Sequence, residues 1–176
     1  MNILILNGSP RPQGDTAKMV SVFQAEAERA GHTVKTFAVC RMNIHGCLAC
    51  EYCHGKGEGV CVQQDDMQQI ARALQETDLL VLASPIYYHN MSGQLKCAID
   101  RFYSAAYPDR PEHLRYAAII LASGDRDIYD GALYSFYGDF VGYLELEDKG
   151  VFTVCGADRL EDKLEEVARF GRSLTD

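Results

Sequence analysis

The sequence predicts a doubly wound α/β fold, a five-stranded parallel sheet in the strand order 2-1-3-4-5 with helices on both faces. Short apolar runs such as Asn2–Asn7 (NILILN) and Asp78–Ser84 (DLLVLAS) are typical of strands buried on both faces. Segments with helical spacing separate these runs, and this alternation indicates parallel strands joined by right-handed crossovers. The order 2-1-3-4-5 is the common solution for a small sheet of this kind. Because the 176 residues contain no linker, we expect one domain over residues 1–176.

Helices and strands are expected to alternate along the whole chain. The first helix ends at Gly31, and a long loop rich in glycine, with cysteines within residues 46–61, follows the second strand. The predicted elements, in chain order, are a strand at Asn2–Asn7, a helix at Asp15–Ala30, a strand at Thr33–Val39, a helix at Asp66–Gln75, a strand at Asp78–Ser84, a helix at Gly93–Ala105, a strand at Tyr116–Ala122, a helix at about Asp130–Tyr143, a strand at about Gly150–Cys155 and a helix at Arg159–Arg172.

The charge, the hydrophobicity pattern and the number of cysteines limit which partners and which cellular location are expected. The net charge of -8 opposes binding to nucleic acid or to an anionic membrane, so neither is an expected partner. The N-terminus lacks a signal-peptide pattern and no apolar stretch could span a bilayer, which predicts a cytoplasmic protein. The odd number of cysteines, seven, argues against a disulfide framework and leaves thiols, thiolates or a metal site. Cys40, Cys97 and Cys155 are expected to be small buried hydrophobes in or beside core elements.

Three loops form the expected ligand site. In doubly wound sheets, ligands bind beyond the carboxyl ends of the strands, where the winding direction reverses. The loops at these positions are residues Gly8–Thr16, Pro85–Ser92 and Ser123–Tyr129. Gly124, in the third loop, lets the backbone approach a ligand closely. We therefore expect these loops to build one site.

The first loop suits a phosphate group. It has neither the G-x-G-x-x-G pattern of a dinucleotide loop nor the lysine of a Walker loop. It offers the hydroxyls of Ser9 and Thr16, the cation of Arg11 and free N–H groups at the start of a helix, whose dipole favours an anion. These groups predict a site for one terminal monophosphate. The alternative is a plain turn in which Ser9, Asp15 or Thr16 only caps the helix.

Two segments carry a resemblance to a known family. G-S-P-R-x-x-G-x-T at Gly8–Thr16 resembles the flavin phosphate loop of the flavodoxin-like NAD(P)H-dependent FMN reductases. That family has a segment closely similar to S-P-I-Y-x-x-x-x-S-G-x-x-K at Ser84–Lys96, followed by an Asp-Arg pair like Asp100-Arg101. The order of elements agrees along most of the chain. Asp15 departs from the asparagine often found before the threonine, and its carboxylate is expected to point away from a phosphate.

The resemblance implies an FMN-dependent oxidoreductase with a flavodoxin-like fold. The expected reaction takes a hydride from NAD(P)H to the flavin and passes electrons to a second acceptor, such as a quinone, a nitroaromatic compound or another flavin. A homodimer or homotetramer is implied as well. Because the flavin carries the chemistry, no side chain is expected as a catalytic acid or base. The residues expected to bind the cofactor are Ser9, Arg11, Gly14, Thr16, Ala17, Pro85, Ile86, Tyr87, Tyr88, Ser123, Gly124 and Asp125.

The second loop is expected to frame the flavin ring. Pro85, Ile86 and Tyr87 supply a rigid apolar wall, and backbone N–H groups of this segment can face the polar edge of the ring. An aromatic pair after a strand also occurs for packing alone, and this alternative stays open.

The cysteine loop has the pattern C-x2-C-x2-C-x7-C at Cys47, Cys50, Cys53 and Cys61. The spacing permits a [4Fe-4S] cluster and ranks zinc lower, because structural zinc more often takes two separated cysteine pairs. Iron-sulfur flavoproteins, a group within the resembled family, have a compact cysteine motif at this point. The resemblance thus implies a second function, electron transfer with a ferredoxin-like partner. Free thiols, a disulfide from Cys53 to Cys50 or Cys61, and a flavin-free adaptor of the same fold stay open.

Overall fold

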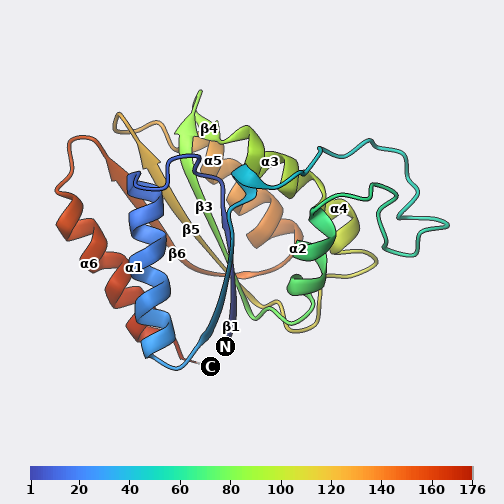
Figure 1. The fold of residues 1–176 in the computed structure, drawn as a ribbon, viewed down its shortest axis with the longest axis horizontal. Helices are drawn as coiled ribbons and strands as arrows, with labels where there is room; N and C mark the ends of the chain where they lie inside the picture. The colour runs from blue at the N-terminus through green and yellow to red at the C-terminus, as the bar shows by residue number, and fades with distance from the viewer. Residues whose placement is uncertain (176) are drawn as a thin grey trace.

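The computed structural model describes residues 1–175, whose strands form one mixed sheet. Within these residues, five strands are parallel in the order β2-β1-β3-β5-β6, and β4 pairs antiparallel with β3 (Figure 1). The predicted order of the parallel strands is confirmed. The elements are β1 (Asn2–Asn7), α1 (Asp15–Arg29), β2 (Thr33–Phe37), the 3-10 helix η1 (Val39–Arg41), α2 (Met67–Leu74), β3 (Leu79–Tyr87), β4 (Asn90–Met91), α3 (Gly93–Asp100), α4 (Phe102–Ala105), β5 (Tyr116–Ser123), α5 (Asp130–Ser135), the π-helix η2 (Phe136–Tyr143), β6 (Glu147–Cys155) and α6 (Leu160–Ser173).

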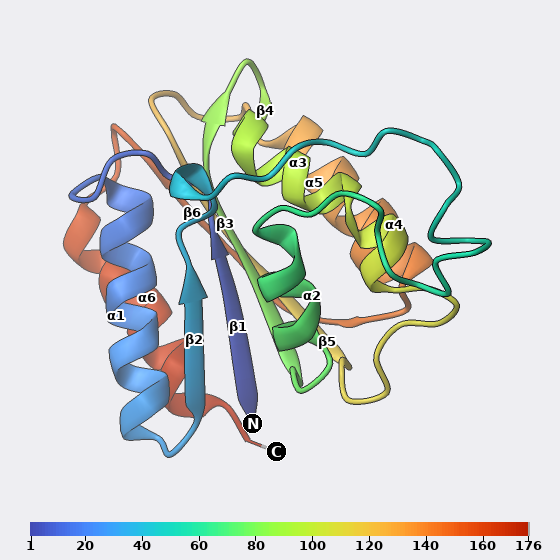
Figure 2. The same cartoon turned by 45° about the vertical axis from the view of Figure 1, so that its right-hand side comes forward.

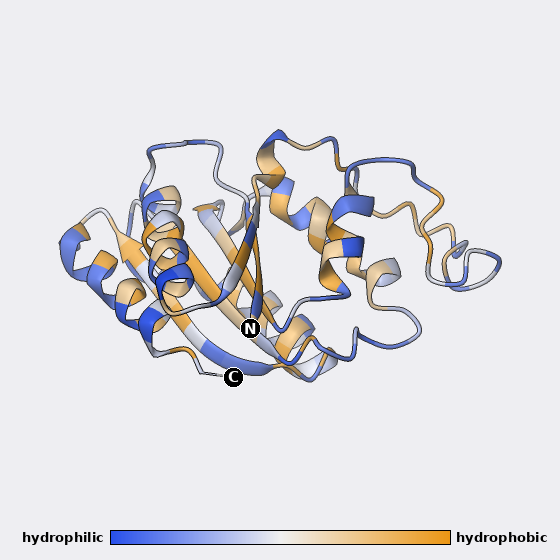
Figure 3. Ribbon diagram, turned by 60° about the horizontal axis from the view of Figure 1, so that its bottom comes forward, coloured by the Kyte–Doolittle hydropathy of each residue, from blue (hydrophilic) through white to orange (hydrophobic). Residues whose placement is uncertain are grey.

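Helices cover both faces of the sheet. α1 and α6 lie side by side on one face, and α2, α3, α4 and α5 lie on the other (Figures 1 and 2). Successive residues of a strand face opposite sides, so Ile3 and Ile5 of β1 pack with α1, whereas Leu4 and Leu6 join the core on the other face. In Figure 3 the central strands are largely hydrophobic, and hydrophilic residues gather on the outer helices and the loops. The apolar runs in the sequence therefore mark strands that are buried on both sides.

A hairpin replaces most of the predicted second loop. The expectation that Pro85–Ser92 is loop was wrong, because β3 continues to Tyr87 and pairs with β4 through Ile86↔Met91 and Tyr87↔Asn90. Two residues connect the strands, Tyr88 with φ of 48° and His89 with φ of 62°. Positive φ at both positions belongs to the two-residue type I′ turn, for which Asn-Gly is the usual sequence. The sequence lacks that signal, so the hairpin could not be read from it.

Two predicted helices are interrupted. The helix predicted at Gly93–Ala105 divides at Arg101. There the Arg101 N–H donates to the Ala98 carbonyl oxygen and the Ser104 N–H donates to the Arg101 carbonyl oxygen, and these hydrogen bonds over three residues tighten the turn. The helix predicted at Asp130–Tyr143 is α-helical only to Ser135 and continues as the π-helix η2. None of the helices within residues 1–175 is both long and apolar enough to cross a membrane.

Candidate functional site

The three predicted loops meet at the carboxyl end of the parallel strands and enclose a cavity of about 300 Å³, here called the three-loop cavity. Its volume is at the lower end of the range for small-molecule sites. The residues that line it are Ser9, Arg11, Asp15, Thr16, Pro85, Ile86, Tyr87, Ala122, Ser123, Gly124 and Gly156. Four residues expected in the site lie outside this lining, namely Gly14, Ala17, Tyr88 and Asp125. The structure thus brings together residues from all three loops that the sequence selected.

The first loop presents the start of α1 to the cavity. The Asn7 Oδ1 accepts a hydrogen bond from the Ser9 N–H at 2.9 Å, and the Gly14 N–H donates to the Arg11 carbonyl oxygen at 3.1 Å. Gly14 is the N-cap residue of α1 and supplies no side-chain cap, so the alternative of a simply capped turn is not what the structure shows. N–H groups at an uncapped helix start are good donors to an anion. The polar end of the cavity is therefore suited to a phosphate.

The charges around the first loop favour the same ligand. Arg11 is exposed and makes no ion pair within residues 1–175, so its guanidinium is free to face an anion. The Asp15 carboxylate pairs with Lys18 Nζ at 3.3 Å on the surface, although Asp15 also lines the cavity. This pair offsets the one negative charge in the lining.

The two serines of the segment Ser84–Lys96 hold the first and second loops together by hydrogen bonds. Ser84 and Ser92 are fully buried and do not line the cavity. The Ser92 Oγ donates to the Gly8 carbonyl oxygen at 2.9 Å, and the Ser92 N–H donates to the Ser84 Oγ at 2.8 Å. A Cβ on Gly8 would lie 2.5 Å from the Ser92 Oγ and 2.8 Å from the Leu95 Cβ. The first and second loops are thus locked together, and this contact requires glycine at position 8.

The third loop leaves space for a ligand. A Cβ on Gly124 would meet no protein atom within 4 Å, so the packing of the protein itself does not require this glycine. The Tyr129 hydroxyl accepts from the Ser123 Oγ at 2.7 Å and donates to the Val154 carbonyl oxygen at 2.9 Å, which fixes the loop. Burial raises the pKa of Tyr129, so its hydroxyl stays protonated as a donor. The sequence did not predict Gly156 in the site. This residue follows β6, the strand at the edge of the sheet, and the expected site contained only the loops after three other strands.

These features agree with the shape and chemistry of FMN. The uncapped start of α1, the hydroxyls of Ser9 and Thr16 and the guanidinium of Arg11 suit its phosphate. The segment Pro85–Tyr87 forms a wall, and the empty space beside Gly124 can accept a flat ring. The residues present therefore fit this cofactor.

The four cysteines of the cysteine loop lie apart from the three-loop cavity and are not assembled into a ligand group. Cys47 and Cys50 are exposed, Cys53 is buried and Cys61 is half-buried, and all four are free thiols. No group of three or more His, Cys, Asp or Glu side chains within residues 1–175 is placed to hold a metal ion. Burial, and then the neighbouring Cys61, raise the pKa of the Cys53 thiol. Four thiols are the right type of ligand for an iron-sulfur cluster, but they are not positioned here to bind one. The assignment of Cys47, Cys50, Cys53 and Cys61 as metal ligands therefore stays a prediction.

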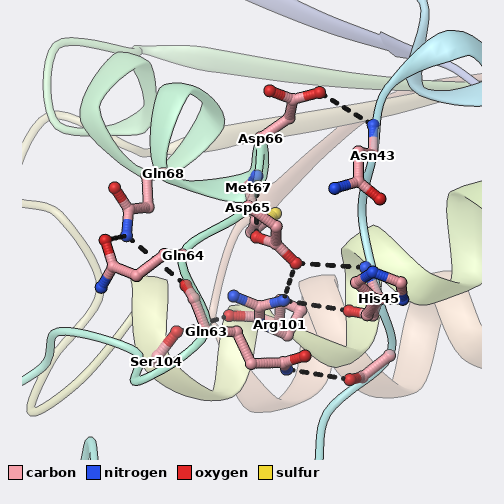
Figure 4. A network of polar contacts seen from close by, with 11 residues as sticks. Asn43, His45, Gln63, Gln64, Asp65, Asp66, Met67, Gln68, Arg101 and Ser104 are labelled. Carbon is pink, nitrogen blue, oxygen red and sulfur yellow. Dashed lines mark hydrogen bonds and ion pairs between the residues drawn. The ribbon is translucent and has the colours of Figure 1, made fainter.

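A buried ion pair anchors the base of the cysteine loop, which we define as residues 43–46 and 63–66 (Figure 4). The Arg101 Nη1 donates to the Asp65 Oδ2 at 2.6 Å and to the His45 carbonyl oxygen at 3.0 Å. The same Asp65 oxygen accepts from the His45 N–H at 3.1 Å. The Asp66 carboxylate accepts from the Asn43 N–H at 2.8 Å. Sequence reasoning noted Arg101 only within a motif and had no signal for its partner, 36 residues earlier.

Farther out, aromatic rings hold the cysteine loop. The His54 ring stacks between Tyr103 and Tyr107, with centroid distances of 3.9 and 4.0 Å. The Tyr103 hydroxyl donates to the Glu51 carboxylate at 3.0 Å. These contacts connect the loop to α4 and to Tyr107, which follows α4, rather than to the three-loop cavity.

Several curated proteins similar to this chain are named iron-sulfur flavoproteins. One from Archaeoglobus fulgidus is 40% identical over 104 residues, which cover 59% of this chain and 46% of that protein. Another, from Methanocaldococcus jannaschii, is 36% identical over 129 residues, which cover 72% of this chain and 64% of that protein. The chain thus spans between 46% and 64% of the length of these relatives.

Solved structures share the architecture at low identity. An NAD(P)H:quinone oxidoreductase from Methanothermobacter marburgensis has a TM-score of 0.78 and 20% identity, covering 98% of this chain and 94% of its own. An FMN-dependent NADH-azoreductase from Bacillus anthracis, solved in complex with FMN, has a TM-score of 0.73 and 16% identity over 97% of each chain. These likenesses show the fold alone, and the predicted flavodoxin-like fold is confirmed. The family model described as NADPH-dependent FMN reductase matches residues 1–165. The chain therefore belongs to the NADPH-dependent FMN reductase family.

Proposed function

We propose that the protein binds FMN in the three-loop cavity and passes electrons from NAD(P)H to a second acceptor. The observation that carries this proposal is the convergence of an uncapped helix start, two hydroxyls and an unpaired arginine at one end of a single cavity. Family membership supports the same cofactor and the same electron donor. Quinones, nitroaromatic compounds and free flavins are the proposed classes of acceptor.

The first loop would hold the phosphate. The Ser9 and Thr16 hydroxyls and the Arg11 guanidinium bind it directly, and backbone N–H groups at the start of α1, including that of Ala17, add donors and the favourable end of the helix dipole. Gly14 allows the chain to turn into the helix beside the Arg11 side chain, since a Cβ there would lie 3.1 Å from the Arg11 Cβ.

The second and third loops would hold the ring. The segment Pro85–Tyr87 would orient one face of the flavin ring, with its backbone N–H groups facing the polar edge of the ring. Gly124 would leave room for the opposite edge of the ring. When bound, FMN supplies hydride and electron transfer, so the protein contributes binding, orientation and exclusion of water. No side chain of the cavity is proposed as a catalytic acid or base.

The phosphate assignment can be tested by comparing FMN with riboflavin, which lacks the phosphate. Arg11→Ala combined with Thr16→Ala removes charge-assisted hydrogen bonds, each worth about 1.5–3 kcal/mol, so FMN affinity should fall by at least roughly a hundredfold. Riboflavin affinity should stay unchanged. Both affinities are measured by the change in flavin fluorescence on titration into the cofactor-free protein.

The control is Arg29→Ala, which removes a cation at the other end of the same helix, where it pairs with Glu26. This variant should bind FMN like the unmodified protein. Unchanged FMN affinity in the double variant would contradict the phosphate assignment. A purified protein that is colourless and takes up no FMN would instead support the flavin-free adaptor.

A second candidate function is electron transfer as an iron-sulfur flavoprotein, with a ferredoxin-like partner. It is favoured by the names of the relatives at 36% and 40% identity and by the four thiols of the cysteine loop. Iron and acid-labile sulfide measured in protein purified without oxygen test it. Stoichiometric iron that is lost in Cys47→Ser and Cys50→Ser would support this function, and iron-free protein of full flavin content would oppose it.

We also propose a cytoplasmic homodimer or homotetramer. Exposed tyrosines support self-association, with Tyr88, Tyr134 and Tyr143 each more than four-fifths exposed. Aromatic side chains of this kind are enriched at protein interfaces. Light scattering coupled to size-exclusion chromatography measures the mass, and a monomer at all concentrations would contradict the proposal.

A further inference from the structure

A cavity of about 370 Å³ lies between α3, α4 and the π-helix η2 and is here called the tyrosine cavity. Figures 1 and 2 show α5, which η2 continues, beside α3 and α4 on the same face of the sheet. None of the residues that line the tyrosine cavity lines the three-loop cavity. Its volume is within the range of small-molecule sites, so it has room for an organic ligand.

Aromatic rings line much of the tyrosine cavity. The buried rings of Phe102 and Phe140 pack edge to face at a centroid distance of 5.5 Å. Tyr103 and Tyr143 are 43% and 82% exposed, so a ligand can reach both rings from solvent. Tyr103 already stacks on the His54 ring at a centroid distance of 3.9 Å. The wall therefore accepts a flat ring that contains nitrogen.

The exposed ring faces of the tyrosine cavity have no cation over them in the described part of the chain. The face of an aromatic ring is negative and attracts a cation within about 6 Å of its centre. The side chains that lie over a ring in this way are those of Lys35, Arg115 and Lys149, and their rings belong to Phe37 and Tyr116, outside the cavity. The cavity thus offers ring faces that the protein itself does not use for this contact.

The charges in the lining favour a cationic ligand. Lys96 and Asp100 form an ion pair with each other, so their charges cancel. Asp139 is exposed and makes no ion pair within residues 1–175, and its carboxylate accepts a hydrogen bond from the Ser135 Oγ at 2.6 Å. With His54 neutral, Asp139 leaves one net negative charge in the lining. A cation would therefore meet an accessible carboxylate beside the aromatic rings.

The π-helix is a separate indication of a ligand site. Segments of this type are rare and occur frequently at functional sites. η2 extends over eight residues, Phe136–Tyr143, and Asp139, Phe140 and Tyr143 of this helix line the tyrosine cavity. The Leu144 N–H donates to the Asp139 carbonyl oxygen at 3.0 Å, the hydrogen bond over five residues that defines this helix type. The unusual backbone thus coincides with the wall of the cavity.

We propose that the tyrosine cavity binds a flat organic cation with a quaternary nitrogen, whose rings contact Tyr103 and Tyr143 and whose charge lies beside Asp139. Aromatic side chains recognise quaternary ammonium ligands through this attraction. The site is separate from the flavin site proposed above and does not depend on it.

The test is calorimetric titration of N-methylquinolinium, with excess FMN present and without NAD(P)H, so that the three-loop cavity is filled. Quinoline has the same rings but no charge at neutral pH, and it should bind about tenfold more weakly. Tyr143→Ala should weaken N-methylquinolinium binding about tenfold, whereas Tyr143→Phe keeps the ring and should bind like the unmodified protein. The matched control is Tyr134→Ala, which removes another exposed tyrosine, outside the lining, and should change nothing.

Asp139→Asn tests the charge by itself. It keeps an acceptor for the Ser135 hydroxyl but removes the carboxylate, so N-methylquinolinium binding should weaken about threefold to fivefold. Quinoline binding should stay unchanged, because this probe has no charge for the carboxylate to attract. An equal loss for both probes would contradict the role of the carboxylate.

No binding of N-methylquinolinium to the unmodified protein, or equal binding in Tyr143→Ala, would overturn the proposal. The alternative occupant of this face is a second copy of the chain. If Tyr143→Ala converts an oligomer into a monomer in light scattering, and no protein binds N-methylquinolinium, the face is an interface and the proposal fails. Weaker binding in Tyr143→Ala at unchanged mass would support it.

Discussion

The three-loop cavity and the base of the cysteine loop differ in what positions their polar groups. In the cavity, the lining residues lie at the carboxyl ends of parallel strands or in the segments that follow them, so the strand order itself brings them together. Neutral contacts such as Ser92 Oγ to the Gly8 carbonyl then fix the loops. The base of the cysteine loop is not positioned by the end of a strand. Instead, the buried ion pair of Arg101 and Asp65 holds this segment in place. The comparison teaches that topology can place a site without charged anchors, whereas a long irregular segment needs one.

The largest expected effect comes from breaking the charged anchor. Asp65→Asn leaves the buried Arg101 guanidinium without its carboxylate, and we expect the unfolding free energy to fall by about 3–5 kcal/mol. FMN affinity should be unchanged, because the three-loop cavity shares no residue with this pair. Urea unfolding and flavin titration measure the two quantities. The control is Asp15→Asn, which removes an exposed partner of Lys18 and should cost less than about 1 kcal/mol.

The same anchor predicts a pH dependence. Burial by itself raises the pKa of Asp65, but hydrogen bonds from Arg101 and from the His45 N–H outweigh it, so the pKa lies below its ordinary value of 3.8. Such a carboxylate adds stability above its unfolded pKa, and this stability is lost as the pH falls through the folded value. We expect a loss of stability below about pH 4 that is shallower in Asp65→Asn. The unfolding free energy is measured in urea at several acidic pH values. An equal dependence on pH in the unmodified protein and in Asp65→Asn would contradict this prediction.

The neutral lock between the first two loops is expected to matter less. Gly8→Ala places a Cβ 2.5 Å from the Ser92 Oγ, and overpacking of this kind costs about 1–3 kcal/mol. Because the two loops would have to separate, FMN affinity should fall together with the unfolding free energy. Gly93→Ala is the matched control, since a Cβ there meets nothing within 4 Å. A Gly8→Ala protein as stable as this control would show that the loops are not locked.

Gly124→Ala separates ligand space from protein packing. A Cβ at Gly124 meets no protein atom within 4 Å, so the unfolding free energy should stay the same. If the space belongs to the flavin ring, the added methyl group should weaken FMN binding about tenfold. Thermal unfolding and flavin titration are compared with Gly93→Ala, which is open but lies outside the cavity. Unchanged FMN affinity would place the ring elsewhere.

The smallest expected effect is a gain in stability at the hairpin. Tyr88 and His89 both have positive φ, a conformation that Asn-Gly adopts with less strain. Tyr88→Asn together with His89→Gly should raise the unfolding free energy by about 1 kcal/mol, as measured in urea. FMN affinity should not change, because the exposed Tyr88 side chain does not line the three-loop cavity. A weaker flavin complex would instead give this turn a role in the site.

The sequence by itself determined the regular part of the fold and most of the three-loop cavity. β1 has the predicted bounds and α1 starts at the predicted Asp15, because hydrophobic spacing and turn residues act over a few neighbouring positions. Ser9, Thr16 and Gly124 meet as expected, since the rule that unites them needs only the order of the strands.

Only the tertiary structure decided the contacts that join distant residues. The bond from Ser92 to Gly8 spans 84 residues and the one from Arg101 to Asp65 spans 36, and neither leaves a periodic trace in the chain. The same holds for Gly156 at the cavity edge and for the separation of the four cysteine sulfurs. A buried guanidinium needs an acceptor, but which group supplies it depends on the packing of α2 against α4, a long-range outcome that local sequence patterns do not encode.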